Sequence, residues 1–179
     1  MNKQFLIWLA GFIDGDGSIY IGVRVQNNNG HDYVAIRPVV NVTQHIQYEW
    51  ICAYIKKNLG LGSVYIANRN GGATAKATWQ TLKINEMIKV LELIKPYLVL
   101  KKHQAKEALS VLKEWAKDIE TGRQGVNVSN CSKIRKQSTV LKIIKIATSL
   151  NATMRTSAKS RGYKTYEEWI PIVKKLYPR

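Results

Sequence analysis

Two hydrophobic periods alternate along the chain and divide it into helices and strands. Residues 4–15 carry apolar side chains at helical spacing, whereas apolar and polar residues alternate one by one from residue 18 to residue 26. In that second stretch the apolar face holds Ile19, Ile21, Val23 and Val25. The pattern predicts a half-buried strand whose other face is rich in hydrogen-bonding groups.

The rest of the chain continues the same order of helices and strands. Asn27-Asn28-Asn29-Gly30 has the composition of a turn, and residues 121–131 have that of a long loop. The further predicted elements are strands over 33–43, 63–69 and 76–84, and helices over 45–59, 86–94, 102–118, 137–150 and 165–177. On the helix over 45–59, the expected buried stripe is Ile46, Trp50, Ile51, Tyr54 and Ile55. The pattern predicts an α+β chain with antiparallel hairpins.

The first predicted helix ends in a distinctive sequence. Its second half, Trp8-Leu9-Ala10-Gly11-Phe12-Ile13, runs directly into Asp14-Gly15-Asp16-Gly17-Ser18. The glycines leave the backbone around the two acids bare and closely approachable. The stretch resembles the LAGLIDADG motif of homing endonucleases, with Ala10, Gly11, Ile13, Asp14, Asp16 and Gly17 in register.

The resemblance extends to the order of elements through residue 118. It implies the LAGLIDADG endonuclease fold, an αββαββα core with a four-stranded antiparallel DNA-binding sheet, followed here by C-terminal helices. We therefore expect a core over residues 1–120 and a basic helical extension over residues 121–179. The extension is expected to pack on the core and to contact DNA.

The net charge indicates a polyanionic partner. The chain carries 28 Lys and Arg against 12 Asp and Glu, a net charge of +16. Residues 131–179 alone hold twelve basic and two acidic side chains. A surplus of this sign is typical of nucleic-acid-binding proteins, although a ribosomal or architectural protein would also carry it.

The composition gives no support to several other classes of protein. Cys52 and Cys131 form no Cys-x-x-Cys pair and the three histidines are scattered, so neither a zinc site nor a disulfide framework is indicated. No apolar run is long enough to span a bilayer, and residues 5–13 end in acids, unlike a signal peptide. We expect an intracellular protein of the cytoplasm or an organelle, with no membrane partner and no small-molecule substrate.

Asp16 is the expected metal ligand. Phosphodiester cleavage requires charge neutralisation at the phosphorus and an activated water, and carboxylate-held divalent metals supply both. Gly15 has no side chain, so its carbonyl oxygen can turn toward the same ion. Hard oxygen ligands fit Mg²⁺, and we expect Mn²⁺ to substitute and Ca²⁺ to bind without supporting cleavage. For Asp14 the resemblance implies a structural role in capping or packing.

The motif occurs once, and one carboxylate is a thin site for a double-strand break. Family members with a single motif act as homodimers on pseudo-palindromic targets, and the resemblance implies the same here. Two copies of the helix over 4–15 would bring two Asp16 side chains together, and a flat helix surface suits close packing. The expected interface residues are Leu9, Ala10, Gly11, Phe12, Asp14 and Gly15.

The resemblance adds two catalytic residues to Asp16. Gln44, which follows Val42-Thr43, matches a family glutamine that positions solvent near the metals. Lys101, within Pro96-Tyr97-Leu98-Val99-Leu100-Lys101-Lys102, matches a family lysine that points into the active-site solvent and stabilises charge on the cleaved phosphate; Lys102 is the alternative if the register shifts by one. Tyr48 stands where related sequences carry arginine and receives no role. His45 and His103 are near enough in sequence to act as general bases, but loop histidines are more often bystanders.

The polar face of the predicted sheet is the expected DNA-reading surface. A β-surface can enter the major groove, where base edges present distinguishable patterns. A strand of about nine residues spans about 30 Å, which covers roughly nine base pairs. The expected contacts come from Ser18, Tyr20, Arg24, Gln26, Arg37, Asn41, Tyr65, Arg69, Lys76, Thr78 and Gln80, and Trp79 could face either way.

Residue type suggests how these contacts divide. Arg24 and Arg37 suit guanine, and the amides of Gln26, Asn41 and Gln80 suit adenine. In the basic extension we expect phosphate contacts from Lys133, Arg135, Lys136, Lys159, Arg161 and Lys164.

The sequence therefore predicts a homodimeric homing endonuclease that cleaves a long pseudo-palindromic DNA target by metal-dependent phosphodiester hydrolysis. No splicing-domain sequence flanks the motif, which favours an intron-encoded enzyme. Two alternatives stay open, an intron RNA maturase and a non-catalytic DNA-binding regulator with the same fold. A ribosomal or architectural protein would not need the Asp-Gly-Asp-Gly turn.

Overall fold

The computed structural model describes residues 2–67, 75–118, 137–152 and 164–178. The elements are α1 (Lys3–Gly15), β1 (Gly17–Asn28), β2 (His31–His45), the 3₁₀ turn η1 (Ile46–Tyr48), α2 (Glu49–Leu59), β3 (Ser63–Ala67), β4 (Lys76–Thr81), α3 (Ile84–Ile94), α4 (Lys102–Asp118), α5 (Gln137–Ala152) and α6 (Tyr166–Leu176). The α+β class and the expected order of helices and strands are confirmed.

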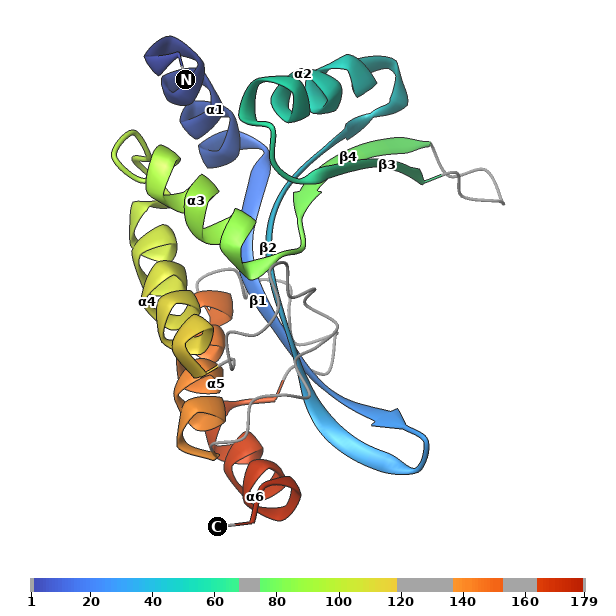
Figure 1. Cartoon of the computed structure of the whole chain (residues 1–179), viewed down its shortest axis with the longest axis vertical. Coiled ribbons are helices and arrows are strands. Elements are labelled where there is room, and N and C mark those ends of the chain that lie inside the picture. Colours follow the sequence, from blue (N-terminus) through green and yellow to red (C-terminus); the bar gives the residue numbers. More distant parts are fainter. Residues whose placement is uncertain (1, 68–74, 119–136, 153–163, 179) are drawn as a thin grey trace.

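The four strands form one antiparallel sheet in the order β1-β2-β4-β3. β1 and β2 pair along their whole shared length, from Gly17 opposite Val42 to Asn28 opposite His31. β4 lies between β2 and the edge strand β3. Figure 1 shows α3, α4 and α5 along one side of the β1–β2 pair, whose turn end extends away from them.

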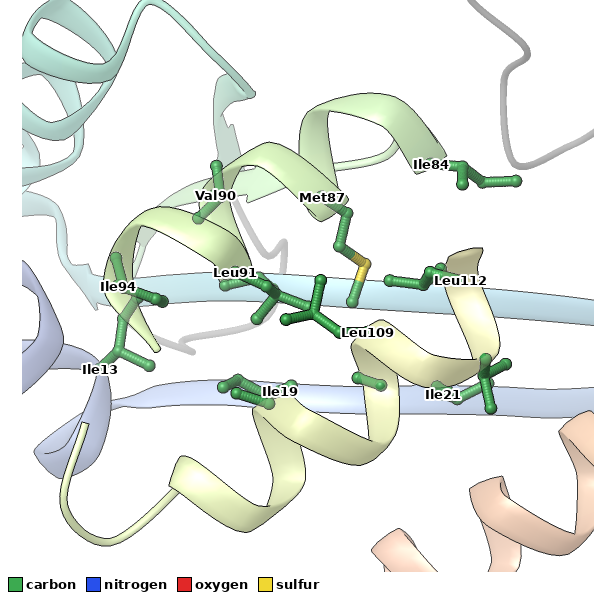
Figure 2. Packing of buried hydrophobic residues seen from close by; sticks show 14 of the residues in the cluster. Ile13, Ile19, Ile21, Ile84, Met87, Val90, Leu91, Ile94, Leu109 and Leu112 are labelled. Atoms are coloured by element: carbon green, nitrogen blue, oxygen red, sulfur yellow. The ribbon is translucent and has the colours of Figure 1, made fainter. Parts of the chain in front are cut away.

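The main core lies between β1 and the helices α3 and α4. Figure 2 shows the packed side chains, which include Ile19 and Ile21 of β1, Met87 and Leu91 of α3, and Leu109 and Leu112 of α4. Burial of an apolar side chain of this size contributes about 1.5–3 kcal/mol. This contribution fixes the apolar face of β1 toward the helices. Because strand side chains alternate, the polar face of β1 is left on the opposite side of the sheet.

A two-residue turn closes the β1–β2 hairpin. Asn29 and Gly30 have φ angles of 52° and 83°, the pair of left-handed conformations that a type I′ turn needs. The Asn27 side chain accepts a hydrogen bond from the Gly30 N–H at 3.0 Å and donates to Asp32 at 2.7 Å. These bonds tie the two strands together at the turn, and both strands are longer than the alternation predicted.

The helix expected over 45–59 differs from the prediction in its start and its buried face. Residues 46–48 form η1, and α2 begins only after them. The buried side chains of α2 are Cys52, Ile55 and Leu59, whereas Trp50 is 60% exposed and Tyr54 is 43% exposed. The predicted buried stripe is therefore wrong at Trp50 and Tyr54, because α2 packs on the sheet through a face rotated toward Cys52.

The register of β4 is fixed by Trp79. Its ring is fully buried, and its indole N–H donates to the Leu61 carbonyl oxygen at 3.0 Å. Trp79 thus faces the helices, and the alternate residues Thr78 and Gln80 lie on the polar face. β4 ends at Thr81, earlier than predicted, because α3 begins three residues later.

The two C-terminal helices complete the described part of the fold. α5 and α6 pack against each other, and they also contact β1 and β2 respectively. α6 begins with a capping box in which the Thr165 hydroxyl and the Glu168 side chain bond each other's backbone N–H groups, and Trp169 and Val173 bury its inner face. Among the described helices none is both long enough and apolar enough to cross a membrane.

Candidate active site and nucleic-acid interface

The Asp-Gly-Asp-Gly sequence lies at the junction of α1 and β1. Leu9 and Ile13 are fully buried and fix α1 against the core. A Cβ on Gly17 would lie 2.7 Å from Ile13 Cα and 3.1 Å from the Asn41 carbonyl oxygen. Only glycine fits so close a contact, which lets the chain pass directly from helix to strand. Asp16, the C-cap residue of α1, is exposed at this junction.

Asp14 points the other way, into the protein. Its carboxylate accepts hydrogen bonds from the backbone N–H groups of Val99 (2.7 Å), Leu100 (3.2 Å) and Lys101 (2.8 Å). These residues directly precede α4, where N–H groups lack partners within the helix and where negative charge is favourable. Asp14 therefore caps α4 and joins it to α1.

Lys101 closes the same junction from the opposite side. Its Nζ donates to the carbonyl oxygens of Ile13 at 2.8 Å and Asp14 at 2.5 Å, in the last turn of α1. A cation is favourable beside these carbonyls because the helix C-terminus carries partial negative charge. The ammonium is thus held against the motif. The sequence resemblance had instead predicted that it would extend into the active-site solvent. The neighbouring Lys102 side chain is exposed, so Lys101 is the lysine that contacts the motif.

Gln44 meets Asp16 directly. Its side-chain nitrogen Nε2 donates to Asp16 Oδ2 at 3.3 Å. The strand register explains the meeting, because Val42 lies opposite Gly17 and Gln44 continues β2 past the end of α1. The structure therefore brings Asp16, Gln44 and Lys101 together at one end of α1.

The exposed oxygen atoms at this junction fit a divalent cation. Asp16 offers a carboxylate, and a Cβ on the exposed Gly15 would meet no atom within 4 Å apart from its own helix backbone and chain neighbours. Carboxylate and carbonyl oxygens are ligands that Mg²⁺ prefers. Within the described ranges no three His, Cys, Asp or Glu side chains gather as a metal-binding group.

Two other titratable side chains, His45 and Cys52, have structural roles in the fold. His45 Nδ1 accepts a hydrogen bond from the Gln47 backbone N–H at 3.2 Å, which starts η1. Burial raises the pKa of the Cys52 thiol, so this cysteine stays protonated at neutral pH and belongs to the core. His103 and Tyr48 are exposed.

The outward side of α1 differs from the expected interface. Leu9 and Ala10 are 0% exposed and Asp14 is bonded to the start of α4, so all three face the chain's own interior. The interface prediction is wrong for Leu9 and Ala10, which are buried in the chain's own core, and for Asp14, whose carboxylate is bonded within the chain. The outward stripe of α1 instead holds Ile7, Trp8, Gly11, Phe12 and Gly15. It is flat at Gly11 and Gly15, where a Cβ would meet no atom within 4 Å.

Aromatic rings extend this stripe onto α2. The Trp8 ring stacks on Phe12 with 5.3 Å between centroids and meets Tyr54 edge-on at 5.4 Å. Beside α4, Val99 and Leu100 are 79% and 77% exposed. Contiguous exposed apolar surface of this kind marks an interaction site.

The polar face of the sheet forms rows that cross the strands. One row holds Ser18, Asn41, Gln80 and Ser63, and the next holds Thr43, Thr78 and Tyr65. The Thr43 and Thr78 hydroxyl oxygens are 2.9 Å apart. Thr78 and Gln80 are buried, so they present little surface, whereas Arg24, Arg37, Tyr65 and Lys76 are exposed.

Some expected contacts lie outside the described residues, and one residue of this face was missed. The former are Arg69, Lys133, Arg135, Lys136, Lys159 and Arg161, whereas Lys164 is described and exposed. The missed residue is Tyr33, which lies opposite Gln26 on the polar face. The signal was available, because Tyr33 precedes Val34 and Ile36 in the alternating pattern of β2.

The fold, the motif at the α1–β1 junction and the polar sheet face are together those of the LAGLIDADG endonuclease family. The model of the LAGLIDADG endonuclease family matches residues 9–108, and the chain belongs to this family. The DNA endonuclease I-CreI of Chlamydomonas reinhardtii is 29% identical over 114 residues, which cover 63% of this chain and 65% of that protein. The DNA endonuclease I-CvuI of Chlorella vulgaris is 34% identical over 110 residues, 60% of this chain and 63% of that protein. The chain thus spans just under two-thirds of the length of each relative.

Solved structures share the fold over nearly the whole chain. The homing endonuclease I-CvuI in complex with the I-CreI target has a TM-score of 0.73 at 23% identity, covering 99% of this chain and 97% of that one. An archaeal intron-encoded homing endonuclease, I-Vdi141I, complexed with DNA, has a TM-score of 0.69 at 19% identity and covers 98% of both chains. At these identities the likeness concerns the fold.

Proposed function

We propose that this protein is a site-specific double-stranded DNA endonuclease of the homing type, which acts as a homodimer and hydrolyses phosphodiester bonds with a divalent metal. The observation that carries the proposal is the Asp16 carboxylate, exposed at the end of α1, hydrogen-bonded by Gln44 and adjacent to the start of a polar sheet face. Membership of the LAGLIDADG endonuclease family and the names of the two DNA endonucleases it resembles support the same activity.

Asp16 and the Gly15 carbonyl oxygen would hold the metal. Bound there, a divalent cation supplies charge neutralisation at the phosphate and lowers the pKa of a coordinated water. Oxygen ligands favour Mg²⁺, with Mn²⁺ as a substitute and Ca²⁺ binding without cleavage. I-CvuI structures determined in the presence of Mg and of Ca agree with a divalent cofactor in a relative.

The neighbouring side chains prepare this site. Gln44 donates to Oδ2 of the Asp16 carboxylate, and Oδ1 would bind the metal. Lys101 places an ammonium in the last turn of α1, beside Gly15 and Asp16, which would hold the metal. Its positive charge offsets the negative end of the α1 dipole and the charge that develops on the cleaved phosphate.

A homodimer supplies what one chain lacks. One chain provides one exposed motif carboxylate, and cutting two strands requires a second. The outward stripe of α1, Ile7, Trp8, Gly11, Phe12 and Gly15, is flat and apolar, and it ends at Asp16. A twofold contact through this stripe would bring the two Asp16 residues together.

The polar sheet face would read the DNA, and the C-terminal part would hold its backbone. The exposed side chains Arg24, Arg37, Tyr65 and Lys76 have the donors that major-groove edges and phosphates accept. In this division residues 1–120 form the endonuclease core, and the basic extension over residues 121–179 adds phosphate contacts through Lys164 and its neighbours.

The test is cleavage of a plasmid that carries the intron-less allele of the gene whose intron encodes the chain. We expect linear product with Mg²⁺, and none with EDTA or with Asp16→Asn. Glu167→Gln, an exposed acid in the first turn of α6, is the matched control and should cleave like wild type. Equal cleavage by Asp16→Asn, or no cleavage of this site, would overturn the proposal. Binding of the intron transcript without DNA cleavage would instead identify a maturase, and duplex binding without cleavage a regulator.

A further inference from the structure

Three side chains on the β1–β2 hairpin form a hydrogen-bonded chain that the sequence did not predict. The Gln26 amide lies between Tyr33 and Arg24 on the polar face. In the amide orientation that satisfies both neighbours, its nitrogen donates to Tyr33 Oη at 3.0 Å. Its oxygen then accepts from Arg24 Nε at 3.1 Å and Nη2 at 2.6 Å. The amide orientation is assigned from this network of partners.

The hydrogen bonds to Gln26 use one edge of the Arg24 guanidinium and leave the other edge available. Gln26 takes the side edge of Arg24, which consists of Nε and one hydrogen of Nη2. The end edge, formed by Nη1 and the second hydrogen of Nη2, is not used by these bonds. An arginine end edge is the fork that pairs with O6 and N7 of guanine in the major groove. A side chain held in advance loses less conformational entropy on binding.

The β1–β2 pairing keeps the end edge of the Arg24 guanidinium exposed and fixes the position of its neighbours. Arg24 lies opposite Ala35, and the next arginine on this face, Arg37, lies opposite Gly22. Each arginine therefore faces a small residue and not a side chain that would compete for it. The Asn29–Gly30 turn, tied by Asn27 to Asp32, holds the two strands in the register that places Tyr33 beside Gln26.

The position along β1 predicts where the contact falls on the target. Arg24 is eight residues beyond Asp16 in the sequence, a distance of about 25 Å along a strand. That distance corresponds to roughly seven base pairs of duplex. The contact thus lies in the outer part of each half-site, well away from the cleaved bond.

We infer that Arg24 recognises a guanine in the outer part of each half-site, and that Gln26 and Tyr33 are positioning residues that hold its guanidinium for this contact. The inference rests on the proposed function, since it needs a bound duplex. It makes Tyr33 a determinant of sequence specificity without requiring Tyr33 to touch a base.

The experiment is selection of binding sites from a randomised duplex library in Ca²⁺, followed by measurement of base preference at each position. Wild type should enrich a guanine on one strand roughly seven base pairs from the centre of cleavage in each half-site. Arg24→Ala should reduce that preference at least about fivefold. Tyr33→Phe and Gln26→Leu should reduce it at the same position, and the preferences elsewhere should persist. Tyr48→Phe, an exposed tyrosine of η1 with no assigned DNA contact, is the matched control and should leave the preference for the outer guanine unaffected.

The outcomes separate this inference from the proposed function. Enrichment of a long site with unchanged outer preference in Arg24→Ala overturns the inference alone. Loss in Arg24→Ala but full preference in Tyr33→Phe and Gln26→Leu overturns the positioning role. Absence of any enriched duplex with wild type overturns both. Thermal unfolding of each variant at the wild-type temperature, together with the loss confined to one position, excludes a general structural effect.

Discussion

Gln44 Nε2 lies 3.3 Å from Asp16 Oδ2, so that the end of β2 holds the carboxylate that α1 delivers. The two residues belong to different elements and are 28 positions apart. Their meeting depends on the pairing of β1 with β2, which sets Val42 opposite Gly17.

Gln44→Ala should therefore slow cleavage while the protein still folds. Removal of a side chain that orients a metal ligand typically costs about 10–100-fold in activity or metal affinity. The measurement is the cleavage rate as a function of Mg²⁺ concentration, and the half-saturating concentration should rise. Gln47→Ala, an exposed glutamine on η1, is the control. Equal effects of the two substitutions would count against a positioning role for Gln44.

The two aspartates of the motif should separate stability from activity. Asp14→Ala leaves three backbone N–H groups before α4 without their acceptor and should lower the free energy of unfolding by about 2–4 kcal/mol. Asp16→Ala removes an exposed carboxylate and should change the free energy of unfolding by about 0.5 kcal/mol or less. The same substitution should abolish cleavage. Urea unfolding and plasmid cleavage measure the two effects. A stable Asp14→Ala protein would contradict the capping role.

Lys101→Met should lower the cleavage rate by about a hundredfold, the cost typical of losing one preorganised charge-stabilising donor. The methionine keeps most of the side chain's length, and it loses the bonds from Nζ to the Ile13 and Asp14 carbonyl oxygens. Single-turnover cleavage at saturating protein isolates this step from DNA binding. Lys102→Met should retain the single-turnover rate, and a similar loss in that variant would show that the two lysines act through overall charge.

Gly11→Glu should produce a folded monomer that does not cleave. A Cβ at Gly11 meets no atom within 4 Å in the single chain, so the substitution fits the fold. A carboxylate in the middle of the α1 stripe would be buried between two subunits. Its desolvation would cost more free energy than association through the stripe supplies. Sedimentation equilibrium measures the change. Lys106→Glu, which puts the same residue on an exposed position of α4, should remain dimeric, and a dimeric Gly11→Glu protein would place the interface elsewhere.

DNA binding should weaken steeply with salt. The net charge is +16, and phosphate contacts are proposed for the extension, so raising monovalent salt from 50 to 200 mM should lower the affinity by about a thousandfold or more. Lys164→Gln should reduce the slope of log affinity against log salt by about 1. A slope near zero would contradict the phosphate contacts.

The strands and the polar face were predictable because each strand is half buried. In β1 the alternation of Ile19 and Ile21 with Ser18 and Tyr20 states directly which side faces the helices. The motif predicted where α1 ends and which acid is exposed. Both signals are local, since they depend on neighbours within a few residues of each other.

The helices were harder, because an apolar stripe does not say what it will contact. Trp50 and Tyr54 on α2 look like core residues and are exposed, whereas Leu9 and Ala10 on α1 look like interface residues and are fully buried. Each of these helices carries apolar side chains for the core and others that the core leaves outside. Only the tertiary arrangement divides the two sets.

The junction at Lys101 depends on contacts between distant parts of the chain, and no periodicity encodes them. Asp14 meets the N–H groups of residues 99–101, and the lysine side chain reaches back to Ile13 and Asp14. The sequence resemblance identified the lysine but not the direction of its side chain. A four-carbon stem can extend in many directions, and the Ile13 and Asp14 carbonyl oxygens at the end of α1 hold the ammonium in this one.

The Asp14 cap also sets an order of events during synthesis. The partners of its carboxylate lie 85 to 87 positions further along the chain, so they leave the ribosome long after α1 does. Until residues 99–101 are synthesised, the Asp14 carboxylate lacks the three backbone N–H groups that bind it in the folded protein. The Asp-Gly-Asp-Gly turn can therefore take its final shape only when more than half of the protein has been made. A nascent or truncated chain that ends before residue 99 carries the whole motif but not the partners that complete its structure.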